Sequence, residues 1–148
     1  MIVGITFSAF DLLHAGHVAM LEDASKQCDY LIVGLHIDPS RERTEKNKPV
    51  QSLVERQLQL RAVKWVDEII TYETEEDLVE ILEMLPIDLR IIGSDYKGKD
   101  FTGKAMSLVP NPKMGIYYHQ RNHSHSSTAL RNAIYEAEFA KQIKRGNE

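Results

Sequence analysis

Apolar residues fall along this chain in two alternating patterns. Short continuous apolar runs, typical of strands buried on both faces of a parallel sheet, occupy residues 1–7, 30–36, 66–72, 88–92 and 114–119. Between most of them, apolar residues recur every three or four positions, as in helices. Strands that alternate with helices through short connections indicate right-handed crossovers. The chain is therefore predicted to be an α/β protein with a Rossmann-like, mainly parallel five-stranded sheet covered by helices on both faces.

The turn after the first strand is the strongest candidate site. A helical pattern begins near His14, and one face of it carries His14, His17, Leu21, Ala24 and Cys28. The two histidines thus lie beside the carboxyl end of a strand, where open α/β sheets bind ligands. Because a helix N-terminus offers free N–H groups and the positive end of a dipole, the expected ligand is an anion. Gly16 would permit close backbone approach.

Three later helices are expected. One is capped by Ser52, and its inward face is predicted to be Val54, Leu58, Ala62 and Trp65. The next runs from residue 75 to 85, after Thr74 and before Pro86. The last follows Ser126-Ser127-Thr128, and its inward residues are predicted to be Leu130, Ile134 and Ala137.

Further polar groups follow other strands and would meet the histidines at the same edge of the sheet. They are Lys46 and Lys48 in a basic loop, then Arg56, Asp95 in a turn, and Arg121 with the hydroxyls of Ser126, Ser127 and Thr128. Taken singly, such features are usually a solvated loop, a turn and a helix cap. Two helix N-termini, two histidines and several cations at one edge predict a polyphosphate site.

Composition narrows the choice of partners and compartment. At 148 residues the chain suits one domain, residues 1–148. A net charge of -4 argues against a general nucleic-acid or membrane surface. No apolar run approaches membrane-spanning length, and the G-x-G-x-x-G fingerprint of dinucleotide binding is missing after the first strand. With Cys28 as its single cysteine, the chain can form no intrachain disulfide, and a cytoplasmic location is expected.

A second group of histidines, His119, His123 and His125, raises the question of a zinc or nickel site. No cysteine lies near them in the sequence, and Arg121 between them would repel a cation. The favoured interpretation is that they shape the nucleotide pocket, and no metal site is predicted. Ser124 stands between two of these histidines, but sequence adjacency does not make a catalytic triad.

The quoted residues match a known family at two separate places. The stretch from Thr6 to Leu21 resembles the nucleotidyltransferase signature G-T-F-D-x-x-H-x-G-H-x-x-x-L, and Ser126-Ser127-Thr128 resembles the second signature, I-S-T-T or I-S-S-T. Asp11-Leu12-Leu13-His14 is most similar to the cytidylyltransferase branch, and within it to glycerol-3-phosphate cytidylyltransferases. The likeness continues through Lys48, Arg56, Trp65-Val66-Asp67-Glu68, Gly93-Ser94-Asp95-Tyr96-Lys97-Gly98-Lys99 and Arg121.

The resemblance implies a reaction and roles for particular residues. An acceptor phosphate would attack the α-phosphate of CTP and release pyrophosphate, with His14, His17, Lys48 (or Lys46) and Arg121 as catalytic residues. Nucleotide contacts would come from backbone near Ala9 and Phe10, from Gly16 and Asp95, and from Ser126, Ser127 and Thr128. Mg²⁺ is expected with the triphosphate, and the resemblance also implies a homodimer.

Two other interpretations stay open. Ser126-Ser127-Thr128-Ala129-Leu130-Arg131 also resembles adenylyltransferases of coenzyme biosynthesis, which would use ATP. A nucleotide-binding regulatory module without catalysis is favoured only by Ser8-Ala9, which stands where the first signature has Gly-Thr. The acceptor is also open, because the helix expected after the third strand is acidic and lacks the acceptor-binding lysine of glycerol-3-phosphate cytidylyltransferases.

Overall fold

A single parallel sheet forms the centre of the molecule. The structure, a computed structural model, describes residues 1–96 and 114–147. The strands are β1 (Val3–Ser8), β2 (Tyr30–His36), β3 (Glu68–Tyr72), β4 (Leu89–Gly93) and β5 (Gly115–His119). The helices are α1 (Ala15–Ser25), α2 (Leu53–Arg61), α3 (Glu75–Met84) and α5 (Ser127–Gly146), with short 3₁₀ turns η1 (Pro39–Arg41) and η2 (Ser94–Tyr96).

The strand order is β3-β2-β1-β4-β5, and every neighbouring pair is parallel. The chain winds outward from β1 through β2 to β3, then returns across the sheet to β4 and β5. The direction of winding therefore reverses between β1 and β4, which makes the carboxyl ends of these strands the expected ligand position. The predicted Rossmann-like five-stranded sheet is confirmed.

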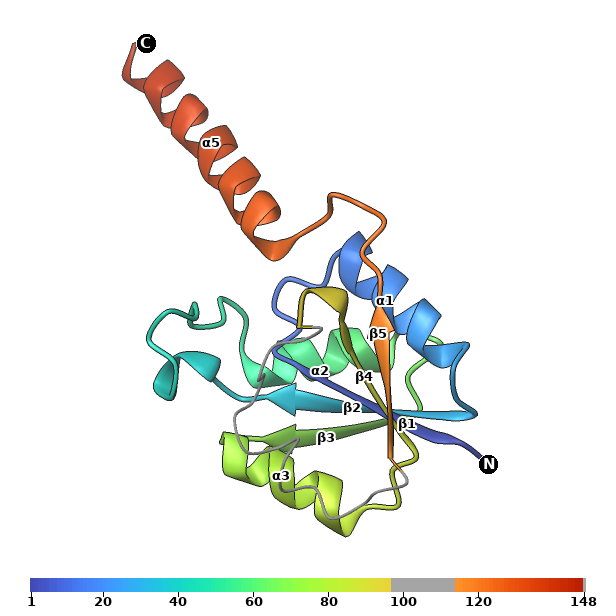
Figure 1. Ribbon diagram of the computed structural model, residues 1–148. Helices are drawn as coiled ribbons and strands as arrows, with labels where there is room; N and C mark the ends of the chain where they lie inside the picture. The colour runs from blue at the N-terminus through green and yellow to red at the C-terminus, as the bar shows by residue number, and fades with distance from the viewer. Residues whose placement is uncertain (97–113, 148) are drawn as a thin grey trace.

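Helices cover both faces of the sheet, as predicted (Figure 1). On one face, residues of α1 and α2 close a core around Leu21, Val33 and Leu60, all fully buried. On the other face, Leu78 and Leu82 of α3 pack against the opposite side of the sheet. Strand β1 therefore lies between two packed layers, and it leads into the turn that carries the histidines.

The predicted inward face of α2 is wrong at Val54, Leu58 and Ala62, although Trp65 does pack against the core. Val54 and Leu58 are 63% and 57% exposed, while Arg56 and Leu60 are buried. Helix α2 ends at Arg61, so Trp65 lies beyond it and Ala62 is exposed. The Arg56 guanidinium donates to the carbonyls of Ala9, His36, Ile37 and Gln51 at 2.6–3.3 Å. Arg56 is therefore a structural residue, because its donors are occupied by backbone and it is only 2% exposed.

The inward face predicted for the last helix is also wrong. Helix α5 has no buried residue, and Ile134 and Ala137 are exposed, although Leu130 is half-buried. Beyond its first turns the helix leads away from the body of the molecule (Figure 1). Across the described ranges, no helix combines the length and apolarity needed to cross a membrane.

Candidate active site

His14 and His17 lie against one another at the N-terminus of α1. His14 is the N-cap, and its Nδ1 accepts a hydrogen bond from the Gly16 N–H at 3.0 Å. His17 Nδ1 accepts from the His14 N–H at 3.2 Å, which completes a capping box built from two imidazoles. The two rings stack with centroids 3.8 Å apart. The predicted position at the head of this helix is confirmed, and the helix cap fixes both rings there.

The same contacts decide which nitrogen carries the proton in each ring. Because Nδ1 of both His14 and His17 accepts from a backbone N–H, the proton of each neutral imidazole lies on Nε2. The pKa of His17 is lowered to about 4, mainly because the ring is buried. The charges of His14 and Arg121 also lower this pKa, whereas the charge of Asp11 raises it. Burial, together with His125 and Arg121, also lowers the pKa of His14. Both rings are neutral donors at neutral pH.

The N-terminus of α5 meets this pair. His14 Nε2 lies 3.1 Å from Ser127 Oγ, so the imidazole N–H donates to the hydroxyl. Ser126 is the N-cap, and its Oγ accepts from the Ala129 N–H at 3.0 Å. The N–H groups of Ser127 and Thr128, in the first turn, have no partner within the helix. Two helix N-termini therefore converge at one place, where their dipoles favour negative charge.

Asp11 ties three segments together beneath the histidines. Its carboxylate accepts from the Val50 and Gln51 N–H groups at 2.8 and 3.0 Å, and from Arg131 Nη2 at 2.8 Å. Arg131 also reaches the carbonyl of Lys48 at 3.5 Å. The basic loop and α5 are thus both anchored to the turn after β1. No local pattern predicts the contact between Asp11 and Arg131, because 120 residues separate them.

The turn itself has an unusual backbone. Phe10 and Leu12 have φ values of 48° and 52°, in the left-handed region that non-glycine residues rarely adopt. The Phe10 ring is 1% exposed and lies 5.3 Å from the His17 ring, centroid to centroid. Such strain persists only where surrounding contacts enforce it, and here Asp11 and the Leu12 N–H bind the basic loop on either side. Backbone strain of this kind concentrates at functional sites.

Gly16 is required by another segment of the chain. A side chain there would place its Cβ 2.9 Å from the His125 carbonyl oxygen and 3.0 Å from the His123 ring. The close approach at Gly16 is thus made by the loop after β5, and its contact with a nucleotide stays a prediction. His123 and His125 stack on one another with centroids 5.2 Å apart, next to the candidate site.

Most of the other predicted site residues have exposed side chains. Arg121 is exposed but close enough for its charge to lower the pKa values of His14 and His17. The side chains of Lys48 and Asp95 are exposed, and that of Lys46 is half-buried. Lys97, Gly98 and Lys99, quoted for the family likeness, lie outside the described residues.

One histidine of the second group is engaged by a carboxylate of α1. His119 Nδ1 donates to Asp23 at 2.7 Å. Within residues 1–96 and 114–147, no group of three or more His, Cys, Asp or Glu side chains is arranged to hold a metal ion.

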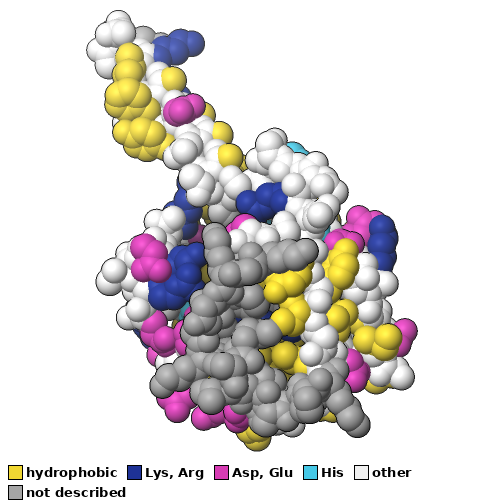
Figure 2. Space-filling view, in the orientation of Figure 1, with side chains coloured by type: hydrophobic (Ala, Val, Ile, Leu, Met, Phe, Trp, Pro, Cys, Tyr) yellow, Lys and Arg dark blue, Asp and Glu magenta, His cyan; other side chains and the backbone are white. Residues whose placement is uncertain are grey.

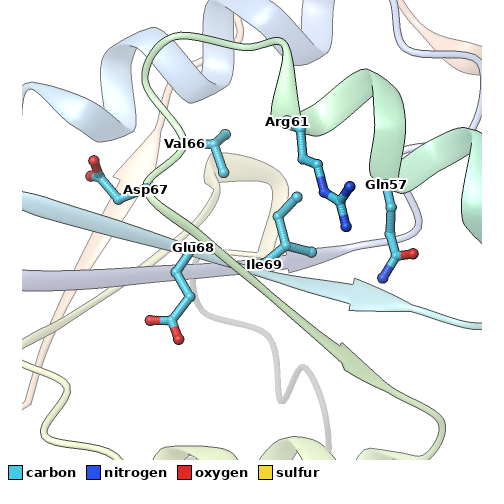
Figure 3. A pocket seen from close by; sticks show the side chains of 6 residues that line it. All are labelled: Gln57, Arg61, Val66, Asp67, Glu68 and Ile69. Carbon is cyan, nitrogen blue, oxygen red and sulfur yellow. The ribbon is translucent and has the colours of Figure 1, made fainter.

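A hollow of about 300 Å³ lies elsewhere on the molecule (Figure 3). It is lined by Gln57, Arg61, Val66, Asp67, Glu68 and Ile69. Glu68 is the first residue of β3, so this hollow flanks the amino edge of the sheet. The histidines lie at the carboxyl edge, and the hollow is therefore not part of the candidate site.

Comparisons with known proteins agree with this geometry. The family model described as cytidylyltransferase-like matches residues 5–133, which include both histidines and the start of α5. The protein HldE, described as bifunctional, is 41% identical over 102 residues in Erwinia tasmaniensis and 40% identical over 113 residues in Mesorhizobium japonicum. These matches cover 68% and 72% of this chain but only 21% and 23% of the relatives. The chain thus spans about a fifth of the length of the curated relatives it matches.

Solved structures share the fold at low sequence identity. A lipopolysaccharide core biosynthesis protein from Thermoplasma volcanium has a TM-score of 0.66 at 22% identity, covering 84% of this chain and 99% of its own. A Vibrio parahaemolyticus protein assigned as a nicotinate-nucleotide adenylyltransferase has a TM-score of 0.57 at 22% identity, covering 93% and 89%. Because the family model matches residues 5–133 of its 148 residues, this chain belongs to the cytidylyltransferase-like family.

Proposed function

We propose that this chain transfers a nucleotidyl group from a nucleoside triphosphate to a small phosphorylated acceptor. An acceptor phosphate oxygen attacks the α-phosphorus, and the bond from that phosphorus to the bridging oxygen of the β-phosphate breaks, releasing pyrophosphate. The acceptor phosphate is already ionised, so the reaction requires positioning and charge stabilisation rather than a strong base. The observation that carries the proposal is the His14–Ser127 contact, which joins two helix N-termini at 3.1 Å.

The histidines act as neutral hydrogen-bond donors. His17 Nε2–H is left free by the cap, because only Nδ1 is engaged there. His14 Nε2–H is given to Ser127, whose hydroxyl proton is then free to bind a phosphate oxygen. The low pKa of each imidazolium keeps the ring neutral, and the N–H of a neutral ring stays bound, so it can donate to the charge that develops in the transition state. The first-turn N–H groups of α5 would hold the β- and γ-phosphates.

Positive charge comes from outside the histidine pair. Arg121 is the cation whose field reaches both rings, and it would neutralise charge on the leaving pyrophosphate. Lys48 or Lys46 would add to it from the basic loop that Asp11 and Arg131 anchor. Ala9, Phe10 and Asp95 are proposed to contact the nucleotide, as the family resemblance implies.

Mg²⁺ would accompany the triphosphate. Asp11, the carboxylate nearest the turn, is already occupied by two N–H groups and Arg131, so it has little capacity to ligate a metal. Mg²⁺ commonly binds substrate phosphates and retains several waters, which requires no site built only from protein side chains. When bound, the ion would supply further neutralisation of the phosphates.

CTP is the first candidate nucleotide, by the cytidylyltransferase resemblance and the matched family model. ATP is the second, because the sequence from Ser126 to Arg131 resembles adenylyltransferases. The acceptor is proposed to be a polyol, sugar or alcohol phosphate. Helix α3 carries Glu75, Glu76 and Asp77 in its first turn, which would repel an acceptor phosphate there. The acceptor phosphate is therefore expected on the α1 and β5 side of the site.

The active form is proposed to be a homodimer, in line with the family resemblance. Helix α5 exposes Tyr135, Phe139 and Ile143 at 69%, 51% and 51%, and the two rings stack 5.9 Å apart. Figure 2 shows hydrophobic side chains gathered along this helix. A helix with so apolar a stripe gains stability by packing it against another surface. A second copy of the chain would supply that surface.

A pyrophosphate-release screen tests the proposal. Each of CTP, ATP, GTP and UTP is incubated with Mg²⁺ and a panel of phosphorylated polyols, sugars and alcohols. Release that requires both a nucleotide and an acceptor is the expected result, with CTP or ATP as the donor. Measurable nucleotide binding with no release across the whole panel would instead support the regulatory interpretation.

A further inference from the structure

The strand β5 is fastened to α1 by a polar contact outside the candidate site. His119, the last residue of β5, donates from Nδ1 to the Asp23 carboxylate of α1 at 2.7 Å. The Tyr117 hydroxyl donates to the same carboxylate at 3.0–3.2 Å. Residues two apart point to one face of a strand, so both side chains of β5 meet Asp23 together. His119 is 8% exposed, which leaves its hydrogen bond little competition from water.

This contact controls where the next residues can lie. Arg121 follows His119 by two residues, so its Cα lies within about 7 Å of the fastened strand end. On the far side of Arg121, the His125 carbonyl and the His123 ring pack against Gly16 at the start of α1. The loop that carries Arg121 is therefore fixed to α1 at both ends, by Asp23 near its last turn and by Gly16 in its first.

The fastening at His119 depends on one bond. His119 Nε2 is buried and has no hydrogen-bond partner among the described residues. The bond from Nδ1 to Asp23 therefore orients the ring, and together with the Tyr117 bond it holds the end of β5 against the helix. An amide at position 23 could still accept from His119, but without the charge that strengthens the bond.

We propose that Asp23 and His119 are positioning residues that hold Arg121 beside His14 and His17. The inference rests on the proposed function, since it assigns to the pair the placement of the cation that neutralises the leaving pyrophosphate. Asp23 itself touches no reacting atom. Its effect on turnover passes through the two-residue connection from His119 to Arg121.

The first test measures placement without turnover. Proton NMR titration of the full chain follows the pKa values of His14 and His17 in the wild type, Asp23→Asn and Arg121→Ala. The positive charge of Arg121 lowers both pKa values, so displacing it in Asp23→Asn should raise them, in the direction that Arg121→Ala gives. Removing the Asp23 charge would by itself lower the pKa of nearby histidines. A rise therefore reports movement of Arg121, whereas no change or a fall would overturn the proposal.

The second test is a double-variant cycle on the reaction. Asp23→Asn is expected to reduce kcat/KM by about 10-fold, because the cation is misplaced. Arg121→Ala should reduce it further, and Asp23→Asn combined with Arg121→Ala should be no worse than Arg121→Ala alone. Losses that multiply would mean that Asp23 acts independently of Arg121, and would overturn the proposal.

A matched variant removes a different carboxylate from the same helix. Glu22→Gln breaks only an exposed pair with Lys26 at 3.8 Å, so it should leave both the histidine pKa values and kcat/KM at wild-type levels. A shift as large as that of Asp23→Asn would show a general charge effect and contradict the proposal. If the wild type releases no pyrophosphate, the proposed function fails, but the NMR titration still decides whether Asp23 places Arg121.

Discussion

His14 Nε2 and Ser127 Oγ lie 3.1 Å apart, so the cap of α1 touches the first residue of α5 although 113 residues separate them in sequence. This contact converts two ordinary helix starts into one anion site. Neither helix alone brings together a neutral imidazole donor, free N–H groups and a hydroxyl. The site therefore depends on how α5 is held against the turn after β1.

Replacing Ser127 by Ala should weaken nucleotide binding more than folding. The variant loses the hydroxyl that joins His14 to the phosphates, so KM for the nucleotide is expected to rise about 10-fold, as one hydrogen bond to a charged group predicts. The melting temperature should change by only a few degrees. Ser124→Ala removes an exposed hydroxyl of the same loop and should leave KM unchanged. An unchanged KM in Ser127→Ala would remove this hydroxyl from the binding site.

Replacing Arg56 by Met should destabilise the fold. Its guanidinium satisfies four carbonyl groups, and their loss in a buried setting is expected to cost about 3 kcal/mol or more in free energy of unfolding. Urea denaturation followed by circular dichroism measures this. Arg61→Met changes an exposed arginine of the same helix and should stay within about 0.5 kcal/mol of the wild type. Equal effects of the two substitutions would contradict the structural role of Arg56.

Stability should fall as the pH is lowered from 6.5 toward 4. The pKa of folded His17 is about 4, against an ordinary value of 6.5, so between these values the unfolded chain binds a proton that the folded chain does not. The free energy of unfolding therefore rises with pH across this window, and the contribution is on the order of 2 to 3 kcal/mol. His17→Gln should reduce this pH dependence in urea titrations. An equally steep dependence in that variant would assign the effect to other groups.

The exposed stripe of α5 should determine the oligomeric state. Light scattering during size exclusion is expected to give a dimer for the wild type and a monomer for Phe139→Glu, because a charge at an apolar interface is costly. Ala137→Glu adds the same charge on the opposite side of the helix, at another exposed position, and should remain dimeric. A monomeric wild type would leave α5 without this partner.

The fold was readable from the sequence where packing follows local pattern. Five apolar runs predicted the five strands, and the His14 and His17 spacing predicted the head of α1. The inward face of α2 was misjudged because a buried Arg56 takes the place that an apolar residue usually fills. That arrangement depends on carbonyls from three other segments, which local periodicity cannot reveal.

The candidate site was readable only in part for the same reason. His14, Gly16, His17 and Ser127 were predicted and meet in the structure. The Asp11–Arg131 and Asp23–His119 contacts were missed, since each joins residues about 100 positions apart. For α5, helical spacing predicted an inward face at Leu130, Ile134 and Ala137, but only Leu130 is half-buried, because spacing does not show what a helix packs against.

Phosphorus NMR of the reaction products distinguishes nucleotidyl transfer from simple hydrolysis. The proposed transfer predicts that pyrophosphate appears in equal amounts with a new product, whose two coupled phosphorus signals mark a bond between the nucleotide and acceptor phosphates. His17→Ala should slow both by at least about 100-fold while its circular dichroism stays native. Release of orthophosphate with a nucleoside diphosphate, and no coupled pair of signals, would show hydrolysis at the γ-phosphate and contradict nucleotidyl transfer.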